Sequence, residues 1–297
     1  MIRKSGKKIL VTGATGNQGS SVADKLLAEG WTLRALTRDP SDAKAKELSA
    51  KGVEVVKGDY NDRASLDAAL GGVCGAFAVF TPFEQGIEAE IQQGINFADA
   101  AKAAGIRHLV YSSVIAANTN TGIPHFDSKN EIEKHIKSIG LPCTVLRPAF
   151  FMYNFESDFY KNAILNGSLP IAIKPYKVHQ MLAPEDMAFF VALAFDNPKD
   201  YIGKELDLAS DEMTMPEAAN CFSRVIGRPV QYKEVPVEQI SKHNEDMGRM
   251  FEWFNRTNFS VDIRALKRLH PEMMTLEWYL RKHGWAETAT RFGRKAA

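Results

Sequence analysis

The 297-residue sequence predicts an α/β fold with a parallel sheet that carries helices on both faces. Three observations predict this class. Short apolar segments alternate with segments of helical periodicity through the first half of the chain. Glycines stand where the helices should end and the next strands should begin. A turn with three glycines joins the first predicted strand to the first predicted helix.

The predicted strands and helices follow one another regularly. Strands are expected at residues 8–12, 32–36, 53–56, 74–80, 108–111 and 143–146. Segments with helical spacing lie between them, at residues 20–29, 41–50, 65–70, 86–104 and 126–138. Asp39 before Pro40 predicts a helix N-cap followed by a proline in the first turn. Helix ends are predicted at Gly30, Gly52, Gly105 and Gly140.

The glycine turn is the most informative local feature. Gly13, Gly16 and Gly19 follow the apolar residues 9–11 and precede the helical segment 20–29. Glycines allow a sharp turn and close approach to a phosphate, and unpaired N–H groups converge at a helix N-terminus. This context favours a Rossmann-type pyrophosphate site over a turn that binds nothing. The Gly-x-x-Gly-x-x-Gly spacing resembles that of extended and atypical short-chain dehydrogenases/reductases.

The regular alternation ends near residue 150. We therefore predict a dinucleotide-binding domain at 1–150 and a smaller α+β region at 151–297, interleaved with the sheet, that receives a substrate or a partner. The second region begins with an aromatic cluster, in which Phe151, Phe155 and Phe159 have the spacing of one helix face. Both a substrate pocket and plain core are compatible with this cluster. Mixed strands and helices are expected at 185–195, 205–208, 216–226, 230–235 and 237–254, with helical spacing again around 273–280.

Composition disfavours several classes of function. The formal net charge is +1 and no lysine-arginine tract is present, so direct nucleic-acid binding is not expected. No apolar segment has the length of a signal sequence or a membrane span. Cys74, Cys143 and Cys221 form no paired motif, and the first two are expected to be buried, reduced thiols of a cytoplasmic protein. The histidines lack metal-ligand spacing, so no metal is expected.

The end of the second predicted strand indicates which dinucleotide binds. An acidic residue there would accept hydrogen bonds from the ribose hydroxyls of NAD, but this strand ends in Leu36-Thr37-Arg38. Because a guanidinium group matches a phosphate, Arg38 predicts NADP(H) as the cofactor. The alternative is that Arg38 is a solvated loop residue.

A further motif lies in the predicted helix 126–138 and just before it. Short-chain reductases carry Tyr-x-x-x-Lys in this region, whereas this chain has Lys129 with His125 at the tyrosine position. His-Phe-Asp-Ser-Lys-Asn at 125–130, Gly-Asp-Tyr-Asn-Asp at 58–62 and Leu-Glu-Trp-Tyr-Leu at 276–280 resemble the NmrA-like family. The resemblance covers nearly the whole chain and is densest over residues 8–156.

The resemblance implies a set of site residues. Lys129 would meet the nicotinamide ribose, and Asp59 would hold the adenine amino group or would only cap a turn. Ser112 and Ser113 would lie near the cofactor or simply pack at a strand end. The implied cofactor-binding residues are Gly13, Thr15, Gly16, Asn17, Gln18, Gly19, Arg38, Asp59, Thr81, Pro82, Lys129, Pro148, Phe151 and Asn154.

Two functions follow from the resemblance. Because the tyrosine is missing, the first expectation is a sensor that distinguishes NADPH from NADP and acts by binding a protein partner. The sensor itself could be a monomer or an oligomer. The alternative is an NADPH-dependent reductase of a small apolar carbonyl, quinone or conjugated imine, with Lys129 and His125 as catalytic residues. Imidazole, with an unperturbed pKa of about 6.5, can donate a proton at neutral pH. A bound water molecule could supply the proton in place of His125. His125 could also be a helix-start residue in contact with solvent.

Overall fold

The computed structural model describes residues 6–258 and 261–296. Contacts divide the chain into two compact units. The first comprises Met1–Pro148 and Met187–Asp207, and the second comprises Ala149–Asp186 and Leu208–Ala297. The chain thus leaves the first unit near the residue where the alternation of strands and helices ends, and later returns to it for one further segment.

The first unit is built on a parallel seven-stranded sheet, which confirms the predicted fold class. Its strands are β1 (Lys8–Thr12), β2 (Thr32–Thr37), β3 (Glu54–Lys57), β4 (Gly75–Val79), β5 (Leu109–Ser112), β6 (Cys143–Pro148) and β10 (Glu205–Leu208). They lie in the order β10-β6-β5-β4-β1-β2-β3. The direction of winding reverses between β1 and β4, and ligands of such sheets bind at that point, beyond the carboxyl ends of the strands.

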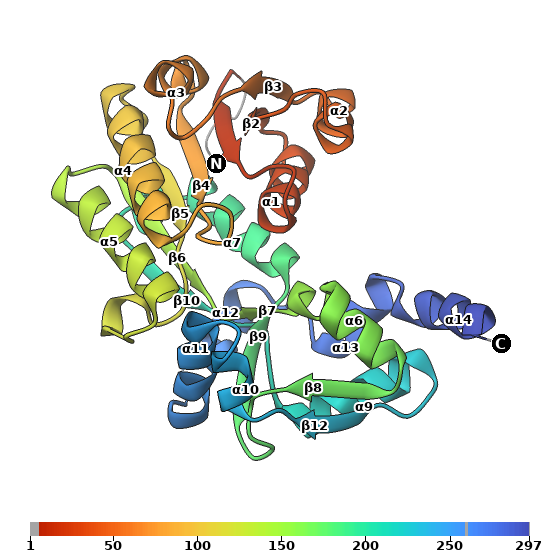
Figure 1. Cartoon of the computed structure of the whole chain (residues 1–297). Coiled ribbons are helices and arrows are strands. Elements are labelled where there is room, and N and C mark those ends of the chain that lie inside the picture. The colour runs from red at the N-terminus through yellow and green to blue at the C-terminus, as the bar shows by residue number, and fades with distance from the viewer. Residues whose placement is uncertain (1–5, 259–260, 297) are drawn as a thin grey trace. The chain divides into compact units, whose positions relative to one another are not determined.

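Helices cover both faces of the sheet (Figure 1). They are α1 (Asn17–Ala28), α2 (Ala43–Ala50), α3 (Arg63–Leu70), α4 (Ile87–Ala103), α5 (Pro124–Ser138), α7 (Pro184–Asp196) and α8 (Pro198–Tyr201). On one face, α3, α4 and α5 bury an apolar core that contains Leu66, Phe97 and Ile132. On the other face α1 lies beside α7, and the rings of Trp31 and Phe195 are 6.2 Å apart.

One predicted helix start is wrong. Asp42, and not Asp39, is the N-cap of α2, and its side chain accepts a hydrogen bond from the Lys44 N–H. Asp39 instead accepts from the backbone N–H and the hydroxyl of Ser41, at 2.8 and 2.6 Å. Pro40 therefore precedes the helix and does not lie in its first turn. An aspartate two residues before a serine can close a local turn as readily as it caps a helix.

The second unit has two small sheets. Its strands are β7 (Phe150–Phe151), β8 (Ser168–Ile171), β9 (Val178–Leu182), β11 (Asp211–Thr214) and β12 (Gln231–Glu234). They pair in the orders β11-β9-β7 and β12-β8. Its helices are α6 (Asp158–Leu165), α9 (Met215–Ile226), α10 (Val237–Ser241), α11 (Glu245–Arg256), α12 (Ile263–Leu269), α13 (Leu276–Lys282) and α14 (Trp285–Ala296). The helix expected around 273–280 is α13.

The aromatic residues at 151, 155 and 159 do not form one helix face. Phe151 lies in β7, Phe155 lies in a short 3₁₀ helix at Met152–Glu156, and Phe159 lies in α6. Phe155 is fully buried, with its ring 5.3 Å from the ring of Phe222, whereas Phe159 is exposed. Regular spacing therefore misled here because the chain changes conformation twice within the segment.

Two further expectations concern burial and membrane segments. Cys74 and Cys143 are only partly buried, which corrects the expectation of buried thiols, and Cys221 is buried. Cys74 stands just before β4 and Cys143 begins β6, so both lie at a rim of the sheet and not in its centre. Within the described part of the chain, no helix has both the length and the apolarity that a bilayer crossing requires.

Candidate dinucleotide site

The glycine turn connects β1 to α1 at the carboxyl edge of the sheet. Gly13 has a φ of +61°, a conformation that glycine adopts without steric cost. The Gly16 N–H donates to the Gly13 carbonyl at 2.8 Å, which closes the turn. A Cβ atom at Gly19 would lie 2.2 Å from that carbonyl oxygen, so α1 packs directly on the turn. The turn has the close packing that a pyrophosphate cradle requires.

The N-terminus of α1 is open to an anion. Its N-cap is Gly16, which has no side chain to accept from the first N–H groups, and the first turn contains no acidic residue. By contrast, Asp42 and Asp62 occupy the N-termini of α2 and α3 with their carboxylates. The N–H groups of the first turn and the helix dipole therefore favour a bound anion at α1.

Cations lie beside this turn at the end of β2. Arg38 is exposed and forms an ion pair of 2.8 Å with Glu84, from the segment after β4. The Lys44 ammonium group donates to the Thr15 carbonyl at 3.1 Å. Sequence reasoning missed Lys44, since only the fold brings the first turn of α2 against the glycine turn. Because Asp39 is engaged by Ser41, the end of β2 presents positive charge.

Asp59 has the turn role that the sequence left open. Its carboxylate accepts from the Asn61 N–H at 2.8 Å, and its own N–H donates to the Ser65 hydroxyl at 3.0 Å. A contact with adenine stays a prediction, since one carboxylate oxygen can accept from a turn while the other remains available.

Lys129 is held in place by a buried carboxylate. Its ammonium group donates to the Phe80 carbonyl at 3.0 Å and forms an ion pair with Glu90. Glu90 lies on α4, is fully buried, and also accepts from the Ser128 hydroxyl at 2.6 Å. The sequence did carry a signal for Glu90, because Gly94 and Phe97 place this glutamate on the apolar side of α4. Sequence reasoning missed it.

His125 lies in the first turn of α5, and Lys129 follows four residues later on the same side of the helix. The His125 side chain is buried, so its interpretation as a helix-start residue in contact with solvent is only half correct. The imidazole ring lies 5.9 Å from the ring of Phe83 and 4.9 Å from the ring of Phe126. The two candidate catalytic side chains thus share one face of α5.

Ser112 and Ser113 bind side chains of the protein. The Ser112 hydroxyl donates to the Oε1 atom of the Gln18 side-chain amide at 2.7 Å, which joins the end of β5 to the start of α1. The Ser113 hydroxyl donates to Glu133 at 2.5 Å, and Glu133 pairs with Arg147. Polar packing at the strand end therefore accounts for both serines.

The carboxyl edge of the first unit collects most of the predicted cofactor residues. The glycine turn, Arg38 and Lys129 have been described above. In addition, the exposed Thr81 and the buried Pro82 follow β4, and the buried Pro148 ends β6. Phe151 and Asn154 belong to the second unit, and their role stays a prediction. The structure thus brings an uncapped helix N-terminus, two cations and the Lys129–Glu90 pair to one edge of the sheet.

Comparison with known proteins identifies the family. The NmrA-like family model matches residues 5–280. An NmrA-like family domain-containing protein of Dictyostelium discoideum is 27% identical over 296 residues, covering 93% of this chain and 97% of that protein. An NAD(P)H azoreductase of Xenophilus azovorans is 32% identical over 241 residues, covering 81% of each chain.

Solved structures share the fold. A triphenylmethane reductase of Citrobacter sp., complexed with NADP(H), superposes with a TM-score of 0.80 at 24% identity, over 93% of this chain and 99% of that one. NmrA, a negative transcriptional regulator, in complex with NAD superposes with a TM-score of 0.80 at 24% identity, over 93% of this chain and 95% of that one. The sequence match over most of its length shows that this chain belongs to the NmrA-like family.

Proposed function

We propose that the first unit binds NADP(H) at the carboxyl edge of its sheet. The main support for this proposal is the uncapped N-terminus of α1. It follows a tightly packed glycine turn, and the first helical turn of α1 contains no acidic residue. Gly13, Thr15 and residues 16–19 would hold the pyrophosphate. Solved relatives of the same fold contain NADP(H) or NAD, which supports the proposal.

Selection of NADP(H) over NAD would rest on Arg38 and Lys44. Both are cations close to the turn, and the carboxylate of Asp39 is already bound to Ser41. A 2′-phosphate would compete with Glu84 for the Arg38 guanidinium, and the gain would be a charge-assisted hydrogen bond.

The activity supported best is reduction of a small apolar carbonyl, quinone or conjugated imine. Bound NADPH supplies hydride transfer. Lys129 would bind the ribose next to the nicotinamide, with Glu90 fixing its ammonium group, and His125 or a water molecule would provide the proton. Pro148, Phe151 and Asn154 would flank the nicotinamide. Support comes from the buried pair at Lys129 and from relatives that are named as reductases.

Cofactor binding is tested at Gly16, the N-cap of α1. Its φ of −96° and ψ of 176° suit any residue, and aspartate is a favoured N-cap. A Cβ atom there would lie 3.3 Å from the Gly13 carbonyl oxygen, so any side chain requires a small shift of the turn. Gly16→Asp should melt near the temperature of Gly16→Asn, because both make the same Cβ contact, while the aspartate carboxylate repels the pyrophosphate and weakens NADPH binding at least about tenfold relative to Gly16→Asn. Gly16→Asn, a neutral cap of the same shape, is the matched control. Equal NADPH binding by the two variants would refute the site.

Turnover is tested with a panel of quinones, azo dyes and conjugated imines, by following NADPH oxidation. The double variant Lys129→Met/Glu90→Gln removes both charges of the buried pair together and leaves neither alone in the core. We expect it to bind NADPH but to lose turnover. A wild-type protein that binds NADPH tightly but oxidises none of the panel would contradict the reductase proposal.

The Arg38–Glu84 ion pair favours a second candidate, a sensor that acts through a protein partner. Capture of Arg38 by a 2′-phosphate would release Glu84 and the segment around it, which includes the strongly exposed Phe83. A cofactor-dependent protein-binding surface needs such a difference between states. Hydrogen exchange of residues 81–86 should rise with NADP and not with NAD. A partner whose affinity is the same with NADP, with NADPH and without cofactor would refute this function.

A further inference from the structure

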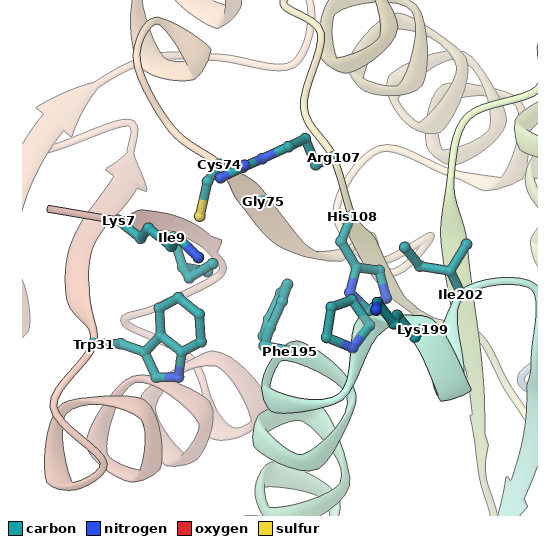
Figure 2. A pocket seen from close by; sticks show the side chains of 11 residues that line it. Lys7, Ile9, Trp31, Cys74, Gly75, Arg107, His108, Phe195, Lys199 and Ile202 are labelled. Carbon is teal, nitrogen blue, oxygen red and sulfur yellow. The ribbon is translucent and has the colours of Figure 1, made fainter. Parts of the chain in front are cut away.

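A cavity of about 300 Å³ lies in the first unit at the amino edge of the sheet (Figure 2). Its position is set by residues at the beginnings of β1, β4 and β5, whereas the glycine turn follows the end of β1. Since a strand rises about 3.3 Å per residue, the five residues of β1 separate the two places by roughly 15 Å. The cavity is lined by Lys7, Ile9, Trp31, Cys74, Gly75, Arg107, His108, Phe195, Pro198, Lys199 and Ile202.

The walls of the cavity are mostly apolar and aromatic. Trp31, which precedes β2, and Phe195, near the end of α7, stand on the same side, with Ile9 above Trp31 in Figure 2. The Phe195 ring lies 6.2 Å from the Trp31 ring and 5.3 Å from the His108 ring. Such walls favour a flat aromatic body, which gains burial area and ring contacts together.

His108 lines this cavity and carries an unused hydrogen-bond acceptor. The side chain is 4% exposed, and its Nε2 lies 2.8 Å from the Thr144 hydroxyl oxygen. That hydroxyl gives its own proton to the Tyr201 carbonyl at 2.7 Å, so Nε2 must donate to it and Nδ1 carries a lone pair. Nδ1 is buried and has no hydrogen-bond partner among the residues that the structure describes. Burial also lowers the pKa of His108 to about 4, which keeps the ring neutral.

Positive charge surrounds the rim. Lys7, Arg107 and Lys199 all line the cavity, and Arg107 and Lys199 are exposed. In the described part of the chain, none of the three forms an ion pair, although Arg107 donates its backbone N–H to the Cys74 carbonyl. Asp196, which follows Phe195, accepts from the Trp31 indole N–H at 3.2 Å. The rim therefore offers cations to an anionic group.

We propose that this cavity binds a small aromatic carboxylic acid that bears a phenolic hydroxyl. The ring would lie against Trp31 and Phe195, the hydroxyl would donate to His108 Nδ1, and the carboxylate would meet the cations at the rim. A volume of about 300 Å³ is at the lower end of ligand sites, which suits a one-ring molecule with a short side chain. A buried acceptor without a donor costs free energy, and this ligand class removes that cost.

The ligand chemistry is tested on the full-length protein with three matched probes by calorimetry. 4-Hydroxycinnamate carries all features, cinnamate lacks the hydroxyl, and 4-hydroxycinnamyl alcohol lacks the carboxylate. We expect 4-hydroxycinnamate to bind tightest, cinnamate roughly fivefold more weakly, and the alcohol roughly tenfold more weakly. Equal affinities for the three probes, or no binding at millimolar concentration, would overturn the proposal.

The location is tested with variants and with the cavity thiol. Arg107→Gln and His108→Phe should weaken 4-hydroxycinnamate binding, whereas Arg264→Gln, an exposed arginine of the second unit, should leave it unchanged. In the wild-type protein the same probe should slow reaction of Cys74 with Ellman's reagent, with Cys74→Ser assigning the signal. Displacement of the probe by NADPH, or an unprotected Cys74, would place the ligand elsewhere and refute the site.

Discussion

The Arg38–Glu84 ion pair gives a quantitative prediction about cofactor choice. Both side chains are more than half exposed, and such a pair contributes about 0.2–1 kcal/mol. A charge-assisted bond from Arg38 to a 2′-phosphate contributes about 1.5–3 kcal/mol. Since the ion pair must open first, the net gain for NADPH over NADH from this residue is roughly 1–2 kcal/mol.

Three variants measure these quantities. Arg38→Gln should weaken NADPH binding about 5- to 30-fold and leave NADH within about twofold, because NADH has no 2′-phosphate. Glu84→Gln removes the competitor and should strengthen NADPH binding by about 1.5- to 5-fold. The double variant should resemble Arg38→Gln. Glu131→Gln, which removes an exposed carboxylate on α5, is the control for a change of net charge.

Fluorescence titration with both dinucleotides at low and high salt is the assay. The effect of Arg38→Gln should shrink at high ionic strength, because exposed charges are screened. An unchanged ratio of NADPH to NADH affinity in Arg38→Gln would refute the assignment of Arg38 to the 2′-phosphate. Stronger NADH binding by Glu84→Gln, equal to the gain for NADPH, would refute the competition.

Three further predictions concern stability. Glu90→Gln leaves the Lys129 ammonium group without its buried partner and should lower the free energy of unfolding by about 3 kcal/mol in urea titrations. The control Glu131→Gln, at an exposed position, should change this free energy little. A loss below about 0.5 kcal/mol in Glu90→Gln would contradict the stabilising role of the pair. Thr214→Ala removes the capping box of α9 and should lower the free energy of unfolding by about 1 kcal/mol. An unchanged free energy of unfolding would show that the cap does not stabilise the protein. His108, whose pKa burial lowers to about 4, binds fewer protons folded than unfolded between pH 6.5 and 4, so stability should fall as the pH is lowered through this window, by at most roughly 3 kcal/mol. His108→Phe should reduce that slope, and an unchanged slope would show that other groups cause it.

Local patterns were sufficient for the sheet and the glycine turn. Alternating periodicity located the strands of the first unit, because each apolar segment is buried between two helix layers. The turn was predictable because strand, glycines and helix are contiguous in the sequence. Asp39 was assigned wrongly, since an aspartate before a serine can close a turn as well as cap a helix.

The remaining features depend on contacts between distant segments. The Glu90–Lys129 pair joins two helices, and the Arg38–Glu84 pair joins the segments that follow β2 and β4. Periodicity gives the side of an element on which a residue lies, but not the residue that it meets. The amino-edge cavity was not predicted at all, because its wall combines Trp31 with Phe195 from a segment that returns to the sheet much later in the chain.

That return has a consequence for anyone who wishes to study the nucleotide-binding half separately. A gene fragment that stops at residue 150 would lack α7 and β10, although both belong to the sheet unit. It would expose Trp31 and the start of β4, which Phe195 contacts in the intact chain. Apolar surface and an unpaired strand at β6 would promote aggregation of such a truncated product. A stable fragment requires a linker that rejoins residues 148 and 187.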